Sequence, residues 1–175
     1  MKLIKSVVML LAVILMAPAA NAALPSVKVK DMKGRTIDTA NLNNGGKPMI
    51  ITFFAGWCKP CRRELNAIAE VYADWQEETG VKIVAISIDK AQDSPKVKQM
   101  VAADGWEYEI LLDPNGDFMR AMGIQQIPHL LILNGNGKIV ESRSGYTDGS
   151  EVHIIEKLRE IMKPAPRRAK SPARK

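Results

Sequence analysis

Residues 53–65 read FFAGWCKPCRREL and contain both cysteines of the chain, Cys58 and Cys61. The pair follows PMIITFFA at 48–55, and such an apolar run, polar on neither face, is typical of a buried central strand. After the pair, apolar residues recur at three- and four-residue spacing over 60–78, which predicts an amphipathic helix. The cysteines therefore lie where a buried strand passes into a helix.

The start of this helix gives the two cysteines different surroundings. Cys58 falls at the N-cap, where unpaired backbone N–H groups and the positive end of the helix dipole favour a thiolate. Cys61 falls one turn inside, and residues at this spacing lie about 5 to 6 Å apart, within reach of a disulfide. We therefore expect a dithiol that cycles between oxidised and reduced forms, with Cys58 as nucleophile and Cys61 as resolving thiol. Lys59 would add positive charge, and Pro60, which lacks an N–H, suits the first turn.

Two other uses of the pair stay open from the residues alone. A zinc site needs four ligands, and His129 and His153 are the remaining soft candidates in the chain. A purely structural disulfide is the second alternative, although closing so short a loop removes little chain entropy. Haem attachment through CxxC is excluded because no histidine follows Cys61. We expect no metal, and no cofactor other than the redox-active Cys58–Cys61 disulfide itself.

The N-terminal 22 residues differ from the rest of the chain. They contain Lys2 and Lys5 near the start, continue with an apolar run of about eleven residues and end in Ala-Asn-Ala. This pattern predicts a cleavable secretory signal over 1–22, with a retained membrane anchor as the alternative. We therefore expect an exported or periplasmic protein.

The C-terminal segment 164–175, PAPRRAKSPARK, combines three prolines and five cations with no large apolar residue. It is predicted to be a disordered basic tail, and peripheral contact with anionic lipid is one use for it. Between the two ends, residues 23–163 contain 18 basic and 19 acidic residues, so the pI near 9.4 does not indicate nucleic-acid binding. We expect one domain over 23–163 and no nucleic-acid partner.

Strand and helix patterns alternate along this domain. We expect strands at 27–31, 48–55, 81–88, 106–112, 129–133 and 138–143, and helices at 60–78, 94–103, 118–122 and 151–162. The first strand and RTIDTANL, which follows Gly34, suggest an N-terminal hairpin, and NGNG predicts another hairpin between the last two strands. The last helix would bury Val152, Ile155, Leu158 and Met162. The sequence thus predicts the α/β class, with a mixed central sheet and helices on both faces.

These motifs together resemble the thioredoxin-like superfamily and, within it, the TlpA/ResA-like branch of exported thiol-disulfide oxidoreductases. The resemblance runs from about Leu24 to Met162 and rests on FFAGWCKPCRREL, VAISID, LLDPNGDFMRAMGI and IPHLLILNGNGKIV. The helix and strand between Asp89 and Asp113 match the insertion that distinguishes this branch from plain thioredoxin. The resemblance implies a thioredoxin-like fold and protein disulfide reductase activity.

The resemblance also implies a substrate surface. The family places a cis-proline opposite the active cysteines, and Ile127-Pro128 stand at that position. By this match Ile127 would pair with the substrate backbone like an added strand, Pro128 would cover the disulfide and Trp57 would contact substrate. A trans proline that begins an edge strand is the alternative for Pro128.

Some positions depart from the family pattern. Thr52 replaces the buried aspartate of plain thioredoxin, so the proton acceptor for the resolving thiol, if a side chain serves, must come from elsewhere. Asp89, at the end of the strand at 81–88, is our candidate, with an ordinary polar strand end as the alternative. Glu64 keeps the branch's CxxE spacing, whereas Asn66 stands where a proline is usual.

The sequence therefore predicts an exported enzyme that reduces disulfides in other exported proteins, with apocytochrome c and cytochrome c maturation as one possibility and a membrane thiol carrier as electron donor. Lys59 and Pro60 are expected to tune the couple. Strong oxidants of the superfamily have histidine at the place of Pro60, so its absence favours a reductase over an oxidase or isomerase. A thiol peroxidase is one alternative. Another is a copper or haem carrier that uses the dithiol and His129, which replaces the threonine usual after the cis-proline.

Overall fold

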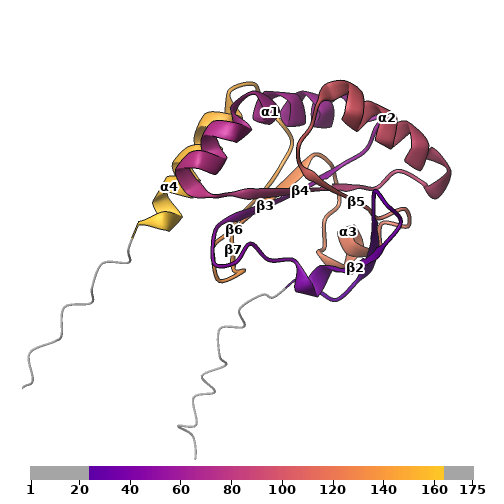
Figure 1. The fold of residues 1–175 in the computed structure, drawn as a ribbon, viewed down its shortest axis with the longest axis horizontal. Helices are drawn as coiled ribbons and strands as arrows, with labels where there is room; N and C mark the ends of the chain where they lie inside the picture. The colour runs from indigo at the N-terminus through magenta and orange to yellow at the C-terminus, as the bar shows by residue number, and fades with distance from the viewer. Residues whose placement is uncertain (1–23, 164–175) are drawn as a thin grey trace, which may run out of the picture.

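The computed structural model describes residues 24–163, which form one seven-stranded sheet with helices packed on it (Figure 1). The predicted signal at 1–22 lies outside the described residues, as does the predicted basic tail at 164–175. Within residues 24–163, no helix is both long enough and apolar enough to cross a membrane.

The sheet is mixed, as predicted. Its strands are β1 (Lys28–Asp31), β2 (Thr36–Asp38), β3 (Met49–Phe54), β4 (Lys82–Ser87), β5 (Glu109–Leu112), β6 (His129–Leu133) and β7 (Ile139–Ser144). They lie side by side in the order β2-β1-β5-β4-β3-β6-β7. β4 pairs in parallel with both β3 and β5, whereas the other neighbouring pairs are antiparallel. The predicted N-terminal hairpin is β1–β2, and the predicted NGNG hairpin is β6–β7.

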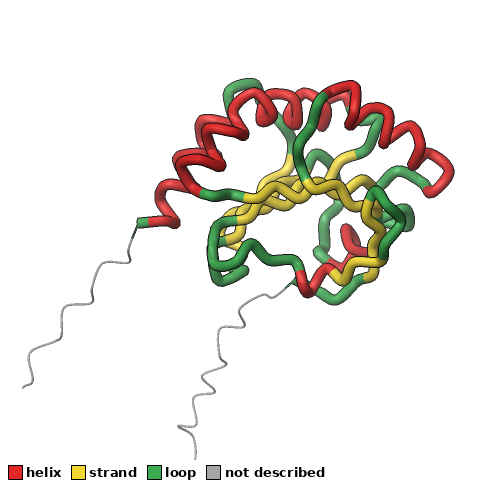
Figure 2. Tube along the Cα trace, in the orientation of Figure 1, coloured by secondary structure: helices red, strands yellow, loops and turns green. Residues whose placement is uncertain are grey.

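Helices cover both faces of the sheet, which also confirms the prediction. They are α1 (Lys59–Thr79), α2 (Ser94–Asp104), α3 (Asp117–Ala121) and α4 (Ser150–Met162), with single 3-10 turns η2 (Thr39–Asn41) and η3 (Ala91–Asp93). α1, α2 and α4 lie along one face and α3 lies on the other (Figures 1 and 2). Gly80 caps the C-terminus of α1, and its positive φ of 65° suits a residue without a Cβ.

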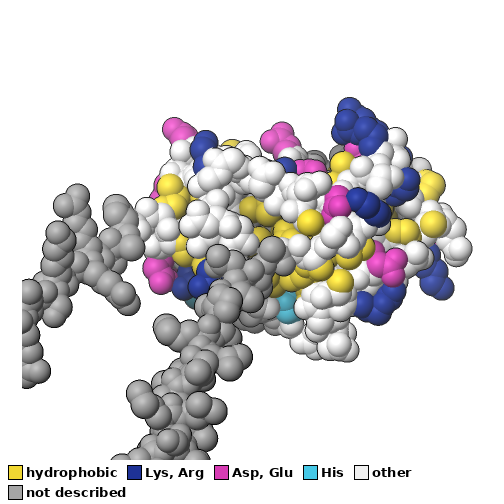
Figure 3. Space-filling view, turned by 90° about the horizontal axis from the view of Figure 1, so that it is seen from below, with side chains coloured by type: hydrophobic (Ala, Val, Ile, Leu, Met, Phe, Trp, Pro, Cys, Tyr) yellow, Lys and Arg dark blue, Asp and Glu magenta, His cyan; other side chains and the backbone are white. Residues whose placement is uncertain are grey.

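The central strand β3 is buried along its whole length because both of its faces are covered. Ile50 and Phe54 join the core beneath α1 and α4, while Ile51 and Phe53 join the core on the α3 side. This explains why the strand reads as a continuous apolar run instead of alternating with polar residues. Figure 3 views the molecule from the α3 side, and hydrophobic side chains gather in the middle of that face.

Two sequence predictions were wrong in detail. The strand predicted at 106–112 begins only at Glu109, because Trp106 and Tyr108 leave the sheet and hydrogen-bond to α1. The predicted apolar face of the last helix was misplaced at both ends. Ile155 and Leu158 are buried as predicted, but Val152 and Met162 are 57% and 47% exposed, because Ile154 completes the inward stripe in their place.

Candidate functional site

The two cysteines are joined by a disulfide at the start of α1, with their Cα atoms 5.3 Å apart. Cys58 is the N-cap residue, and its sulfur accepts the backbone N–H of Cys61 at 3.3 Å. Cys58 retains 6% of its surface exposed, whereas Cys61 retains none. A reacting molecule can therefore reach the disulfide through Cys58 and not through Cys61.

The chain that leads from β3 to this helix holds the disulfide at the surface. The Cys58 N–H donates to the carbonyl of Ala55 at 3.0 Å, which closes a tight turn. Trp57 projects from this turn and is 71% exposed. The first turn of α1 contains no acidic residue, so the backbone N–H groups and dipole of the helix act on Cys58 without an opposing charge there.

The cations near the disulfide differ in how freely their charge acts. Lys59 is exposed and forms no ion pair with any residue of the described chain. Pro60 is exposed beside it in the first turn of the helix. Arg62, in contrast, makes two hydrogen bonds to the carboxylate of Asp104 at 2.6 and 2.5 Å. Of these two cations, Lys59 is therefore the one whose charge is unpaired at the start of the helix.

The Ile127-Pro128 peptide bond is cis, and Pro128 is buried. β6 pairs with β3 so that His129 lies opposite Phe53, which places Pro128 at the end of the sheet where β3 leads to the disulfide. The carbonyl of Pro128 accepts the N–H of Gly145 at 2.8 Å. The half-buried Ile127 precedes it at the same end of the sheet.

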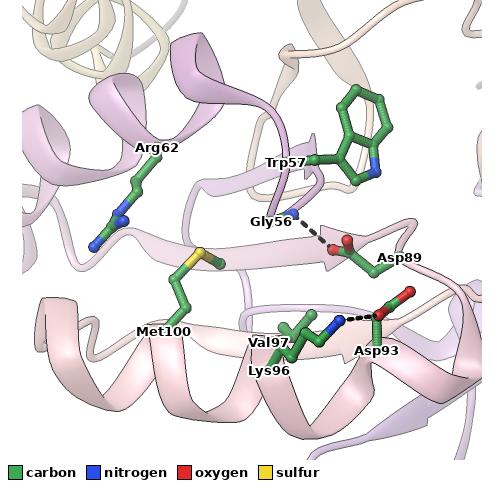
Figure 4. A pocket seen from close by; sticks show the side chains of 8 residues that line it. All are labelled: Gly56, Trp57, Arg62, Asp89, Asp93, Lys96, Val97 and Met100. Atoms are coloured by element: carbon green, nitrogen blue, oxygen red, sulfur yellow. Dashed lines mark hydrogen bonds and ion pairs between the residues drawn. The ribbon is translucent and has the colours of Figure 1, made fainter.

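Asp89 lies beside the turn that precedes the disulfide. One of its carboxylate oxygens accepts the Gly56 N–H at 2.8 Å (Figure 4). The same oxygen accepts the Ser87 hydroxyl at 2.9 Å. It lines a pocket of about 400 Å³ between this turn and α2. The other lining residues are Gly56, Trp57, Arg62, Asp93, Lys96, Val97 and Met100. In this position Asp89 fixes the backbone before the disulfide.

A second carboxyl group lies inside the core on α1. Glu64 follows Cys61 by one turn, and only 1% of its surface is exposed. The hydroxyl of Thr52 donates to one oxygen at 3.3 Å, and the guanidinium of Arg143 approaches the other at 3.5 Å. Burial raises the pKa of Glu64 to about 7, although Arg143 and Thr52 oppose this shift.

The sequence reasoning did not assign Glu64 a role in proton transfer. The signals that could have identified it are its spacing of three residues from Cys61 and the threonine at position 52. Thr52 stands in β3 where plain thioredoxin has its aspartate, and here its hydroxyl points at a carboxyl group supplied by the helix. The structure thus places a carboxyl group from α1 beside Thr52 of β3.

His129 follows the cis-proline on the face of β6 turned away from α1. Its two ring nitrogens contact the hydroxyls of Ser144 and Ser142 at 2.6 and 2.9 Å. Burial lowers the pKa of this imidazole. In the part of the chain that the structure describes, no three acidic, histidine or cysteine side chains gather in a way that could hold a metal ion.

Known proteins resemble this chain in sequence and in fold. The family model described as the AhpC/TSA family matches residues 20–142. A thioredoxin-like protein of Porphyromonas gingivalis, known from its solution structure, is 57% identical and superimposes with a TM-score of 0.72. That match covers 80% of this chain and 92% of the other.

Other relatives carry names that refer to a redox reaction. The thiol-disulfide oxidoreductase ResA of Halalkalibacterium halodurans is 27% identical over 136 residues, which cover 78% of this chain and 73% of ResA. The ResA of Bacillus subtilis is 26% identical over 129 residues, or 74% and 69% of the two chains. The crystal structure of StoA from B. subtilis shares the fold, with a TM-score of 0.58 at 24% identity over 81% of this chain and 99% of StoA.

Proposed function

Because the chain belongs to the AhpC/TSA family of thioredoxin-like proteins, we propose that it is a thiol-disulfide oxidoreductase that reduces disulfides in exported proteins. The observation that carries the proposal is the asymmetry of the disulfide. Cys58 caps α1 and reaches the surface, whereas Cys61 is fully buried one turn later. The names of the ResA relatives support the same chemistry.

The reaction starts from the reduced dithiol. The Cys58 thiolate attacks one sulfur of a substrate disulfide, which forms a mixed disulfide and releases the first substrate thiolate. Cys61 then loses its proton and attacks the Cys58 sulfur, which releases the second substrate thiolate. Two electrons pass from the dithiol to the substrate, and the protein is left with the disulfide seen in the structure.

Glu64 fits the role of proton acceptor for Cys61 better than Asp89 does. It lies one helical turn from Cys61 inside the core, and a carboxyl group with a pKa of about 7 can both accept and release a proton near neutral pH. Asp89 accepts the N–H of Gly56 and has a structural task in the turn. We therefore assign proton acceptance to Glu64 and keep Asp89 as a supporting residue.

The first turn of α1 bears on the direction of electron flow. Pro60 supplies no hydrogen bond to stabilise the Cys58 thiolate, so the reduced form lacks the support that makes a strong oxidant. The exposed charge of Lys59 acts in the opposite sense but is screened by solvent salt. We propose a reductase that takes electrons from a membrane thiol carrier, in the periplasm or another exported location.

The substrate is an exported polypeptide with a disulfide, and apocytochrome c is one member of that class. Its chain would lie against Trp57, Ile127 and Pro128, with the backbone of Ile127 pairing like an added strand. The exposed indole of Trp57 offers apolar surface next to Cys58. Recognition through backbone groups would leave the protein with little preference for one substrate sequence.

Insulin reduction by the purified, reduced protein tests the activity. We expect insulin to precipitate in the presence of a thiol donor, and Cys58→Ser to abolish this reaction. Cys61→Ser, expressed in the source cell, should accumulate mixed disulfides on Cys58 that identify substrates and donor. Full activity in Cys58→Ser, or no reduction of insulin by the wild type, would contradict the proposal.

The same preparations test two other activities. A thiol peroxidase would consume hydrogen peroxide at a rate that depends on Cys58, and that result would replace the reductase. A metal carrier that uses His129 would have to give up a hydrogen bond to Ser142 or Ser144. Stoichiometric copper binding by the reduced protein, lost in His129→Ala, would support a carrier.

A further inference from the structure

We propose that Arg143 of β7 is a positioning residue for the second half of this reaction, because it keeps the Glu64 carboxylate charged and aligned to accept the proton of Cys61. This inference rests on the proposed function and on the part assigned there to Glu64. In this role Arg143 does not touch the reacting sulfurs and acts only through the carboxylate of Glu64.

The sheet register brings Arg143 to Glu64 from 79 residues away. Arg143 lies opposite Leu130 in the β6–β7 pair, and paired residues on antiparallel strands point to the same face. Leu130 belongs to the core beneath α1, together with Cys58 and Cys61. The side chain of Arg143 therefore enters the core on the side of the disulfide, while its neighbours in β7, Ser142 and Ser144, contact His129 on the other face.

The burial of Arg143 is costly unless an anion compensates it. Its side chain is 20% exposed, and its Nε is buried with no hydrogen-bond partner among residues 24–163. A guanidinium that loses water in this way is stabilised mainly by a nearby opposite charge. The carboxylate of Glu64 is that charge, at 3.5 Å from the guanidinium.

The groups around Glu64 come from several parts of the fold. Thr52 of β3 donates a hydrogen bond, Cys61 precedes Glu64 by one turn on α1, and Tyr108, in the segment before β5, lies close enough to interact with its charge. Tyr108 stays uncharged, because burial raises its pKa far above neutral pH. Within residues 24–163, Arg143 is the only cation that pairs with Glu64.

The consequence of losing this cation follows from the balance of two effects. Burial favours the neutral carboxylic acid, whereas Arg143 and Thr52 favour the carboxylate, and the balance leaves the pKa of Glu64 at about 7. Without Arg143 only Thr52 opposes burial, so the group stays protonated at neutral pH. A protonated Glu64 cannot accept the proton of Cys61, and release of the second thiolate slows.

Reaction of the fully reduced protein with 5,5′-dithiobis(2-nitrobenzoic acid) separates the two halves. The first thionitrobenzoate is released when Cys58 attacks, and the second when Cys61 resolves the mixed disulfide. In Arg143→Met we expect an unchanged first phase and a second phase about 5-fold slower at pH 7, with its pH midpoint raised by about one unit. The second phase should recover at higher pH, and Arg143→Lys should restore most of the rate.

Matched variants separate a charge effect from a loss of structure. Arg159→Met removes an exposed arginine that pairs with Glu78, and it should leave both phases unchanged. Arg143→Gln keeps a polar side chain without charge, so it gives the same test if Arg143→Met does not fold. In a Glu64→Gln background, Arg143→Met should produce no further shift of the pH midpoint.

An unshifted pH midpoint in folded Arg143→Met or Arg143→Gln would overturn this inference. The reagent needs no protein substrate, so the result does not depend on insulin reduction. A shifted midpoint in a protein that fails to reduce insulin would reject the proposed function and keep the role of Arg143. Insulin reduction with an unshifted midpoint would keep the proposed function and reject the role of Arg143.

Discussion

Glu64 couples the protonation of one side chain to the stability of the whole fold. In the folded protein its pKa is about 7, whereas an unfolded chain leaves it near its ordinary value of 4.5. The folded state therefore holds this proton more tightly than the unfolded state. The stabilisation from Glu64 is complete below about pH 4.5 and is lost as the pH rises through about 7.

We expect the pH dependence of stability to change in Glu64→Gln, which stays neutral at every pH. Between pH 4 and pH 8, the wild type should lose about 3 kcal/mol of unfolding free energy relative to the variant. Urea unfolding of both oxidised proteins at the two pH values measures this difference, because other titrating groups cancel. If the unfolding free energies of the two proteins changed equally between pH 4 and pH 8, Glu64 would titrate in the folded protein as it does in an unfolded chain.

The residues of the site were predictable to the extent that their roles are local. Cys58 at the N-cap and Cys61 one turn inside follow from the strand and helix patterns on either side. The cis-proline at 128 came from the resemblance and is present in the structure. Arg143, in contrast, reads as one polar residue in KIVESR, and only the pairing of β6 with β7 brings it to Glu64.

At the scale of elements, α1 is tied to the segment that precedes β5. The indole N–H of Trp106 donates to the side-chain oxygen of Asn66 at 2.7 Å, and the hydroxyl of Tyr108 donates to the carbonyl of Leu65 at 2.7 Å. The family resemblance predicts a proline at position 66, and the side chain of Asn66 has a partner that a proline would not provide. The departure from the family pattern therefore has a structural use.

Removing this contact should weaken the junction without touching the disulfide. In Asn66→Ala, the buried indole of Trp106 loses its acceptor, and we expect a loss of about 1 to 2 kcal/mol in unfolding free energy. Chemical denaturation measures it, with Asn43→Ala as the control because Asn43 hydrogen-bonds only within its own loop. Equal stability of the two variants would mean that water replaces the lost acceptor.

Element boundaries were harder to predict than element types, because some boundaries depend on contacts between distant parts of the chain. Hydrophobic periodicity correctly indicated a strand before Asp113 and a helix near the C-terminus. It could not show that Trp106 and Tyr108 turn towards α1, since that depends on partners 40 and 43 residues away. Such contacts between elements exist only once the sheet has assembled.

At the scale of the whole molecule, the disulfide and a close backbone contact between two glycines lie at opposite ends of the sheet. The disulfide follows the C-terminal end of β3, whereas Gly46 precedes its N-terminal end. There Gly135, from the turn between β6 and β7, approaches Gly46 so closely that a Cβ would lie 2.0 Å from the Gly46 carbonyl oxygen. Neither strand end can move aside without shifting backbone.

We therefore expect Gly135→Ala to cost about 1 to 3 kcal/mol in unfolding free energy, because an added methyl group forces the two segments apart. The rates of both thionitrobenzoate phases should stay at wild-type values in the protein that remains folded. Asn136→Ala, in the same turn and with an exposed side chain, is the control and should unfold like the wild type. A changed second phase in Gly135→Ala would show that the two ends of the sheet are coupled.

The position of β5 also limits how this architecture can change over evolutionary time. β5 belongs to the segment inserted between β4 and α3, yet it is the strand that joins β1 to the rest of the sheet. A descendant could discard β1 and β2 and keep a continuous five-stranded sheet. One that discarded β5 would leave the N-terminal hairpin with no strand to pair with, so the hairpin depends on the insertion for its place in the sheet.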